Sequence, residues 1–351
     1  MTVGVAIIGT GVMGAEHARL LDRQVAAARV CGVFDLDADR AAATAGRLRS
    51  ARAFDDPFEL ISERTVDAVL VASSDPTHEQ FVLAALAAGK PVLCEKPLAP
   101  DVAGCERIVA AELAAGRRLV SVGFMRRFDP GYRQLKQAVD DGGLGLPLML
   151  HCTHRNQQAP AGLSGELVIS GSAVHELDIA RWLLGDELSR ITVHRPRSSR
   201  AALPAEDPLF LVVESSTGVL IDIEVFVNSR YGYEVRCELV GEQGTVSLDA
   251  PAPILERRAG AVRRGVPPDW RPRFEAAYRE ELQNWIDSVE QGVPSGAATS
   301  WDGYAATLAA EAAIAALRTG IAQPVSARQR PQLYPAPPGG QGWLARTVAP
   351  A

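Results

Sequence analysis

Lysine is rare in this chain, and one copy occupies a position suited to chemistry. Of the 36 basic residues, only Lys90, Lys96 and Lys136 are lysines, so arginine carries nearly all of the positive charge. An arginine stays protonated near neutral pH, whereas a buried lysine amine can have its pKa shifted and can then donate or accept a proton. Lys96 follows the apolar run Pro91-Val92-Leu93 and the dipeptide Cys94-Glu95, which places it at the end of a predicted strand. Lys96 is therefore a candidate catalytic residue, and the alternative is a surface lysine at a strand end.

A glycine-rich turn near the N-terminus predicts a dinucleotide site. The apolar, β-branched run at residues 3–8 predicts a buried strand, and it leads into Gly9-Thr10-Gly11-Val12-Met13-Gly14. In this pattern the glycines permit a tight turn, a close approach of the backbone to a pyrophosphate and close packing of helix on strand. Residues 15–29 are predicted to form the following helix, whose free N–H groups bind the phosphates.

An acidic residue specifies the nucleotide. Residues 30–35 predict a second strand that ends in Asp35, about twenty residues beyond the glycines. A carboxylate at this position binds a ribose 2′-hydroxyl and repels a 2′-phosphate, which favours NAD over NADP as the cofactor. Asp37 is the competing acid, and we interpret it as part of the first turn of the next helix.

The alternation of strands and helices continues to about residue 124. Strands are predicted at residues 67–74, 91–94 and 119–124, with helices at about 76–88 and 102–115. This alternation is typical of a doubly wound, parallel α/β sheet, whose ligands bind at the carboxyl ends of the strands. For His78, capping or packing at a helix start is an equal alternative to a cofactor contact. The residues predicted to bind the cofactor are Gly9, Gly11, Val12, Met13, Gly14, Asp35, Ser73, Ser74, His78, Glu95 and Lys96.

Beyond residue 125 the pattern changes to strands separated by turn residues. These runs predict a largely antiparallel sheet, and helical spacing predicts a helix at 174–184. The first strand carries His151, Cys152 and His154, which are residue types that ligate metals. Because alternate residues of a strand share a face, His154 and Asn156 point the same way and His151 points the opposite way, so no metal site is predicted. The predicted strands are 147–156, 209–215, 220–227, 234–240 and 244–248, and the other predicted helices are 130–141, 274–290 and 303–318.

Composition excludes several classes of protein. A chain of 351 residues with 47% hydrophobic content suits two domains with sizeable cores. No apolar stretch reaches membrane-spanning length and no charged leader precedes the first strand, so we expect a cytoplasmic protein without a membrane partner. The five cysteines are scattered, which indicates reduced thiols and no zinc spacing. The net charge of −6 argues against a nucleic-acid partner.

Several segments together resemble the Gfo/Idh/MocA oxidoreductase family, and within it most closely the inositol 2-dehydrogenases. They are the glycine turn at 9–14, Glu95-Lys96-Pro97, the segment 123–129 and Ala173-Val174-His175-Glu176-Leu177-Asp178. The resemblance covers about residues 3–320. It implies an NAD-dependent enzyme that oxidises a ring hydroxyl to a ketone reversibly.

The resemblance also implies a domain organisation. An NAD-binding Rossmann domain, with its doubly wound parallel sheet, is expected at 1–123. A C-terminal α+β domain with a large, mostly antiparallel sheet is expected at 124–330, where it binds the substrate and assembles homodimers or homotetramers. The Pro- and Gly-rich tail at 331–351 cannot form a core of its own and is expected to be disordered or to lie over a neighbour.

Oxidation of an alcohol requires a base that removes the hydroxyl proton as the carbon gives up its hydride. His175 is the candidate, because it falls in the first turn of the predicted helix and a helix N-terminus keeps an imidazole neutral. A histidine that opens a helix is often structural, but the family motif favours the base. Lys96 would then hydrogen-bond the reacting oxygen. The resemblance assigns the polyol contacts to Arg126, His154, Asn156 and Tyr233.

One position departs from the inositol dehydrogenases, which carry an aspartate four residues before this histidine. Here the position is Gly171, so the carboxylate that orients the histidine is missing. Three accounts compete: Asp178 orients His175, a polar group of the substrate fills the space, or the protein binds its ligands without turnover. A smaller residue also enlarges the pocket, which suits a sugar or an aminocyclitol within a larger glycoside.

Three functions follow from these residues. The first is an NAD-dependent dehydrogenase of a cyclitol or sugar, with aminoglycoside biosynthesis as one setting. The second is a catalytically silent protein that binds NAD and a polyol. The third is redox-assisted cleavage of a glycoside on the same fold.

Overall fold

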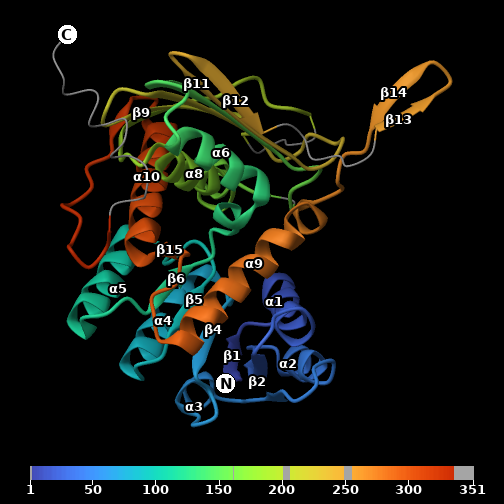
Figure 1. Ribbon diagram of the computed structural model, residues 1–351, viewed down its shortest axis with the longest axis vertical. Coiled ribbons are helices and arrows are strands. Elements are labelled where there is room, and N and C mark those ends of the chain that lie inside the picture. The colour runs from blue at the N-terminus through green and yellow to red at the C-terminus, as the bar shows by residue number, and fades with distance from the viewer. Residues whose placement is uncertain (1, 161, 201–205, 249–254, 336–351) are drawn as a thin grey trace. The chain divides into compact units, whose positions relative to one another are not determined.

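The computed structural model describes residues 2–160, 162–200, 206–248 and 255–335 (Figure 1). These residues form two compact units that are each discontinuous in sequence, whereas the expected domains were continuous ranges. Helices α9 (Trp270–Gln291) and α10 (Ser300–Thr319) contribute residues to both units. Within the described residues, the first unit comprises 2–128, 276–307 and 329–335, and the second comprises 129–275 and 308–328.

The first unit contains a seven-stranded sheet with the order β15-β6-β5-β4-β1-β2-β3. The first six strands in the chain pair in parallel, which confirms the predicted doubly wound sheet, and β15 joins the edge of β6 antiparallel. All six residues of β1 are buried, as expected of a central strand with both faces covered. The strands are β1 (Val3–Ile8), β2 (Ala28–Phe34), β3 (Arg52–Ala53), β4 (Ala68–Val71), β5 (Val92–Cys94), β6 (Val120–Val122) and β15 (Ala298–Thr299).

The helices of this unit follow the predicted rhythm with one clear difference. Helix α1 ends at Arg23, although the prediction extended it to residue 29. The chain turns at Ala27, which has a positive φ of 56°, and β2 already begins at Ala28 because its residues pair with β1. The helices are α1 (Val12–Arg23), α2 (Ala38–Ala45), α3 (Pro57–Ser62), α4 (His78–Ala87) and α5 (Val102–Ala115), with short 3₁₀ turns η1 (Asp75–Thr77) and η2 (Met125–Phe128).

The end of the described chain returns to the first unit. Tyr334 is buried, and its hydroxyl donates to Glu112 Oε2 over 2.8 Å. Glu112 is fully buried and its other oxygen accepts the N–H groups of Leu119 and Val120 at 2.6 and 2.7 Å. Burial raises the pKa of Tyr334, so the phenol remains a donor at neutral pH. The tail at 331–351 was expected to be disordered or to lie over a neighbour, whereas Tyr334 is buried within the first unit. Residues 336–351 lie outside the described residues.

The second unit is built on a seven-stranded sheet with the order β12-β11-β7-β10-β9-β8-β16. Only the β7–β10 pair is parallel, so the prediction of a mostly antiparallel sheet is confirmed. Strand β8 and the separate hairpin β13–β14 were not predicted. The strands are β7 (Pro147–Arg155), β8 (Leu188–His194), β9 (Leu209–Ser215), β10 (Leu220–Phe226), β11 (Glu234–Gly241), β12 (Gly244–Leu248), β13 (Leu255–Arg258), β14 (Ala261–Arg264) and β16 (Gln323–Pro324).

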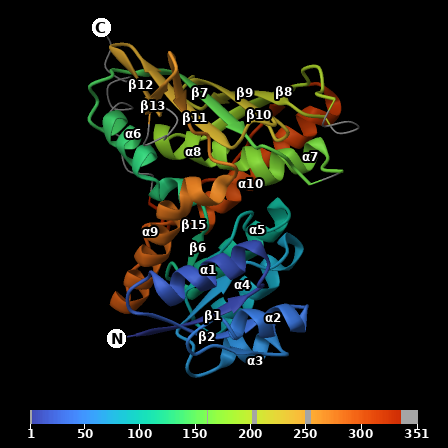
Figure 2. The ribbon, with the colours of Figure 1, turned by 90° about the vertical axis from the view of Figure 1, so that its right-hand side faces the viewer.

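Helices cover one face of this sheet, and no helix of the described residues lies on the other, which we call the open face (Figure 2). Helices α6 (Pro130–Asp140) and α8 (Val174–Leu184) lie on the covered face (Figure 2). Along β7 the residues alternate accordingly, with His154 buried and Arg155 half-exposed. Among the helices in the described part of the chain, none combines the length and the apolar character needed to span a bilayer.

The segment before α8 is also helical. Helix α7 (Gly165–Val168) continues through a π-helical turn, η3 (Ile169–Ala173), directly into α8. Ala173, which precedes α8, has φ −60° and ψ −23°, the values of a helix interior. The predicted helix at 174–184 is confirmed with His175 in its first turn, but η3 precedes it, so His175 lies within a continuous helical run.

Candidate active site

The glycine turn in the first unit forms a backbone cradle. A Cβ at Gly14 would lie 1.9 Å from the carbonyl oxygen of Gly9, so this position packs the helix directly on the turn. Gly9 has a φ of 93°, and a Cβ there would lie 2.5 Å from the backbone of Ser73. At Gly11 a Cβ would meet no atom within 4 Å, which leaves open space above the N-terminus of α1. These three environments are those that a bound pyrophosphate requires, so the turn fits a dinucleotide.

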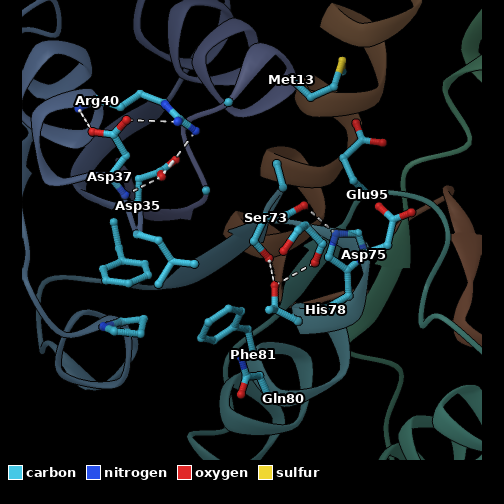
Figure 3. A pocket seen from close by; sticks show the side chains of 18 of the residues that line it. Met13, Asp35, Asp37, Arg40, Ser73, Asp75, His78, Gln80, Phe81 and Glu95 are labelled. Carbon is cyan, nitrogen blue, oxygen red and sulfur yellow. Dashed lines mark hydrogen bonds and ion pairs between the residues drawn. The ribbon is translucent and has the colours of Figure 1, made fainter. Parts of the chain in front are cut away.

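This cradle opens into a cavity of about 800 Å³ that lies within the first unit (Figure 3). The ends of β1, β2, β4 and β5 supply most of its wall, as expected for the carboxyl edge of a parallel sheet. Every residue predicted to bind the cofactor lines this cavity, except Gly14, which packs behind the turn.

Asp35 is held in place at the end of β2. One carboxylate oxygen accepts the backbone N–H and the hydroxyl of Thr10 at 2.7 and 3.0 Å, and the other accepts the N–H of Asp37 at 3.0 Å. Partial burial acts to raise the pKa of Asp35, but these hydrogen bonds and the charge of Arg40 hold it below its usual value. Asp35 therefore carries a negative charge at neutral pH. As interpreted from the sequence, Asp37 begins the next helix, where its side chain caps α2 by accepting the N–H of Arg40.

Several cavity residues were missed by the sequence reasoning. The guanidinium nitrogens of Arg40 lie 3.5 Å from a carboxylate oxygen of Asp35 and 3.0 Å from one of Asp37 (Figure 3). The end of the cavity that Asp35 lines therefore also carries a positive charge. Phe58 and Phe81 pack against each other with ring centroids 5.7 Å apart and give the wall an apolar patch. Phe58 is half-exposed although it is aromatic, and its place after the Asp-Asp-Pro run was the available signal.

Lys96 and Glu95 stand at the other end of the cavity. Glu95 Oε1 accepts a hydrogen bond from His17 Nε2 over 2.7 Å, and Oε2 accepts the backbone N–H of Lys96 over 3.2 Å. Burial acts to raise the pKa of Glu95, but the His17 hydrogen bond and the charge of Lys96 hold it below its usual value. His78 is almost fully buried, with its ring nitrogens 2.7 Å from the Pro97 carbonyl and 3.1 Å from the Ser73 carbonyl. His78 thus has the structural role foreseen for it in addition to lining the cavity.

In the second unit, a buried polar chain runs from α8 to the end of β7. His154 Nδ1 donates to Glu176 Oε2 over 3.1 Å, since a carboxylate can only accept, and Nε2 lies 3.0 Å from the side-chain oxygen of Asn156. Both His154 and Glu176 are buried. The His154–Asn156 contact confirms that the two share a face of β7. Glu176 was quoted only as part of a motif, and its role as the partner of His154 was missed.

Two aromatic rings surround His154. The ring of Tyr233 lies 5.7 Å from it, edge to face, and the ring of His175 lies 6.4 Å from it. His175 is buried on α8. Because η3 continues into α8, the backbone around His175 lies inside a helical run, and the proposed role of His175 rests on its position in the cluster and on the family motif. Arg126, the remaining predicted polyol contact, is buried in η2 of the first unit.

A second cavity, of about 460 Å³, lies within the second unit. Asn156, Gly171 and Tyr233 line it, so the structure brings together three of the predicted substrate residues. Gly171 is exposed in the π-helical turn, and a Cβ there would meet no atom within 4 Å. Within the described ranges, no three His, Cys, Asp or Glu side chains gather in an arrangement that could bind a metal ion.

Known proteins provide an independent comparison. Residues 3–124 match the model of an oxidoreductase family with an NAD-binding Rossmann fold, and residues 132–247 match the GFO/IDH/MocA C-terminal domain. The chain is 51% identical to inositol 2-dehydrogenase 2 of Saccharopolyspora erythraea over 95% of its length and 98% of that protein. It is 45% identical to inositol 2-dehydrogenase of Burkholderia ambifaria, over 95% of this chain and 99% of that protein.

A solved structure agrees over the same extent. The crystal structure of myo-inositol dehydrogenase from Lactobacillus casei, in complex with NAD(H) and myo-inositol, superposes with a TM-score of 0.92 at 35% identity and covers 95% of this chain and all of that one. The cradle, the charged Asp35 and the two matched domain models point to the same conclusion: this chain belongs to the Gfo/Idh/MocA family of oxidoreductases, and its cofactor is NAD.

Proposed function

We propose that this protein oxidises a secondary hydroxyl on the ring of a cyclitol, such as an inositol, to a ketone. The observation that carries the proposal is the second cavity, whose wall combines the amide of Asn156 and the phenol of Tyr233 with the adjacent imidazole of His154. Neutral donors and acceptors at a concave surface are the groups that recognise the hydroxyls of a ring polyol. Similarity to inositol 2-dehydrogenases over nearly the whole chain supports the same substrate class.

The chemistry assigns two roles. When bound, NAD supplies the hydride acceptor. The alcohol must lose its hydroxyl proton in the same step, and in this proposal the imidazole of His175 takes that proton. The amine of Lys96, which lines the NAD cavity, hydrogen-bonds the alcohol oxygen and stabilises the negative charge that develops there. Arg126 completes the polyol contacts.

Two further properties belong to the same proposal. The open face of the second unit's sheet carries exposed apolar residues, including Met149 and Leu220, which pair across β7 and β10. A homodimer or homotetramer through this face would bury them. We also propose that the protein works in the cytoplasm, and that a sugar or an aminoglycoside precursor is the alternative class of substrate.

Absorbance of reduced nicotinamide, recorded with NAD and a panel of inositols, hexoses and aminoglycosides, tests the proposal. At least one inositol is expected to reduce NAD. Replacing Lys96 or His175 by alanine should lower kcat/KM by a factor of about 10²–10⁴, the usual contribution of a positioned acid or base. Cofactor binding without reduction by any of these compounds would overturn the proposal.

A second candidate is favoured by one observation. The resemblance implies an aspartate at the position of Gly171, and among the described residues outside its own helical turn none lies within 4 Å of the place that a Cβ would take. A protein that binds NAD and a polyol without turnover would show saturable binding of both in calorimetry and no reduced nicotinamide. Redox-assisted cleavage of a glycoside would instead yield cleavage products with no net reduction of NAD.

A further inference from the structure

The cavity of the second unit is larger than a single polyol ring needs. Its volume of about 460 Å³ lies in the range of roughly 300–1,000 Å³ that is typical of sites for drug-sized ligands. Part of this space exists because Gly171 has no side chain, since a Cβ at this position would meet nothing within 4 Å. The cavity therefore extends beyond the place where an aspartate would close it.

The walls beyond Gly171 differ from those near Tyr233. Trp270, at the start of α9, offers a half-buried indole ring, and Gln157 and Gln158 offer exposed amides after the end of β7. A flat aromatic face packs against the C–H groups of a sugar ring, while planar amides bind its hydroxyls as both donors and acceptors. The Arg271 guanidinium lies 5.8 Å from the centroid of the Trp270 ring, and an indole beside two exposed amides is a combination that suits a pyranose ring.

Charge narrows the class of ligand. Among the described residues that line the cavity, Asp269 is the only one with a charged side chain. It is held in an ion pair with Arg271, whose guanidinium donates to it over 2.6 Å. The Arg271 hydrogen bond keeps the pKa of Asp269 low, so the pair is formed at neutral pH and its net charge is zero. A neutral substituent therefore suits these walls better than a phosphate, a carboxylate or an amine.

We propose that the region between Gly171 and Trp270 is a subsite for a neutral sugar ring attached to the cyclitol, so that the substrate is a glycosylated cyclitol. Gly171 provides the passage for the glycosidic link, and Trp270 with Gln157 and Gln158 holds the sugar. This inference rests on the proposed oxidation of a cyclitol, which would take place on the ring bound near Asn156 and Tyr233.

The test compares myo-inositol with galactinol, in which a galactose is linked to inositol, and with isomers that carry the sugar on other ring hydroxyls. The wild-type enzyme should show a kcat/KM for at least one glycoside about tenfold or more above that for free myo-inositol. Gly171→Asp should reverse this ratio, because a carboxylate occupies the passage. Trp270→Ala should reduce the ratio by roughly tenfold, because the stacking surface is lost. Ile321→Ala, an exposed position outside the cavity, is the matched control.

Ligand-observed NMR with the same compounds provides a readout that does not depend on turnover. Binding of the glycoside that is weakened by Trp270→Ala supports the subsite even if no compound reduces NAD, in which case only the proposed oxidation fails. Thermal melting and NAD titration establish that each variant is folded. A different result would overturn the subsite and leave the oxidation intact. In that case free myo-inositol is oxidised, and the ratio of kcat/KM for the glycoside to kcat/KM for myo-inositol is the same in the wild type, Gly171→Asp and Trp270→Ala.

Discussion

The NAD cavity of the first unit and the second unit's cavity are built from different parts of the chain. The NAD cavity depends on backbone positions in one short turn, where Gly9, Gly11 and Gly14 each meet a different steric requirement. The second cavity depends on residues that follow β7, lie in η3, directly precede β11 and begin α9. A backbone cradle tolerates almost no variation, whereas a wall of separate side chains can change one residue at a time. The resemblance read from the sequence is accordingly complete at the glycine turn and departs from the expected motif at Gly171.

The largest expected effect contrasts two glycines of the cradle. Gly14→Ala places a Cβ 1.9 Å from the Gly9 carbonyl oxygen, so α1 and the glycine turn must move apart. This displacement should lower the free energy of unfolding by at least about 1–3 kcal/mol and abolish NAD binding. Gly11→Ala meets no protein atom, so it should weaken NAD binding with a change in stability within about 0.5 kcal/mol. Denaturant unfolding and calorimetry with NAD separate the two. Equal losses of stability in both variants would contradict the assignment.

The next effect concerns the second unit. Glu176→Gln keeps an acceptor for His154 Nδ1 but removes the negative charge that orients this ring in a chain that lacks the helix aspartate. We expect kcat/KM for the cyclitol to fall by about 10–100-fold, as for other carboxylates that orient a functional histidine, while the Kd for NAD stays unchanged. Steady-state kinetics over a range of pH is the measurement.

Glu214→Gln, an exposed position on β9, is the control for this substitution. If Glu176→Gln has the same kcat/KM as the control variant across the pH range, the hydrogen bond between His154 and Glu176 has only a structural role.

A smaller effect tests cofactor choice. Asp35→Ser removes the carboxylate that repels a 2′-phosphate and frees Arg40 from one of its two acidic partners. We expect NAD to lose about tenfold in kcat/KM, since hydrogen bonds to a charged group contribute roughly 1.5–3 kcal/mol, and NADP to gain. Asp37→Ser, which leaves Asp35 in place, should retain the preference for NAD. An unchanged ratio of NAD to NADP in the Asp35 variant would refute the role of this carboxylate.

The smallest effect is a pH dependence in the first unit. Because the pKa of Glu95 is lower in the folded state than in the unfolded chain, its ionised form stabilises the fold above the unfolded value, and this contribution is lost as the pH falls through the folded value. Glu95→Gln should therefore destabilise the protein by about 1 kcal/mol at pH 7, and the difference should shrink as the solution is acidified below about pH 4.5. Urea unfolding at several pH values measures it. A difference that is constant with pH would contradict this assignment.

Contiguous motifs were predictable from the sequence, and contacts between distant residues were not. The glycine turn, Asp35 and Lys96 each follow a strand end, so the rule that ligands bind at the carboxyl edge of a parallel sheet was enough to place them in one cavity. Alternation along β7 likewise placed His154 and Asn156 on one face. Arg40 and Glu176 were missed because their roles arise from pairs that only the folded chain brings together.

The helical character of the segment before α8 was not predicted. This segment contains Ser170, Gly171 and Ser172, which are poor helix formers. In the structure these residues lie in the π-helical turn η3 (Ile169–Ala173). Burial of Ile169 and Ala173 compensates for the low helix propensity of the serines and the glycine between them. A π turn widens the backbone locally and is common at functional sites, which no periodicity of three to four residues can indicate.

The contact between Tyr334 and Glu112 has a consequence for how this protein is made. The first unit also includes residues 276–307 and 329–335, so residues 2–128 alone lack both hydroxyls, of Ser300 and of Tyr334, that donate to Glu112 Oε2. A nascent chain that has exposed its complete nucleotide motif therefore still lacks two donors to this carboxylate on α5. Cofactor capture during translation would therefore precede the completion of the very unit that performs it.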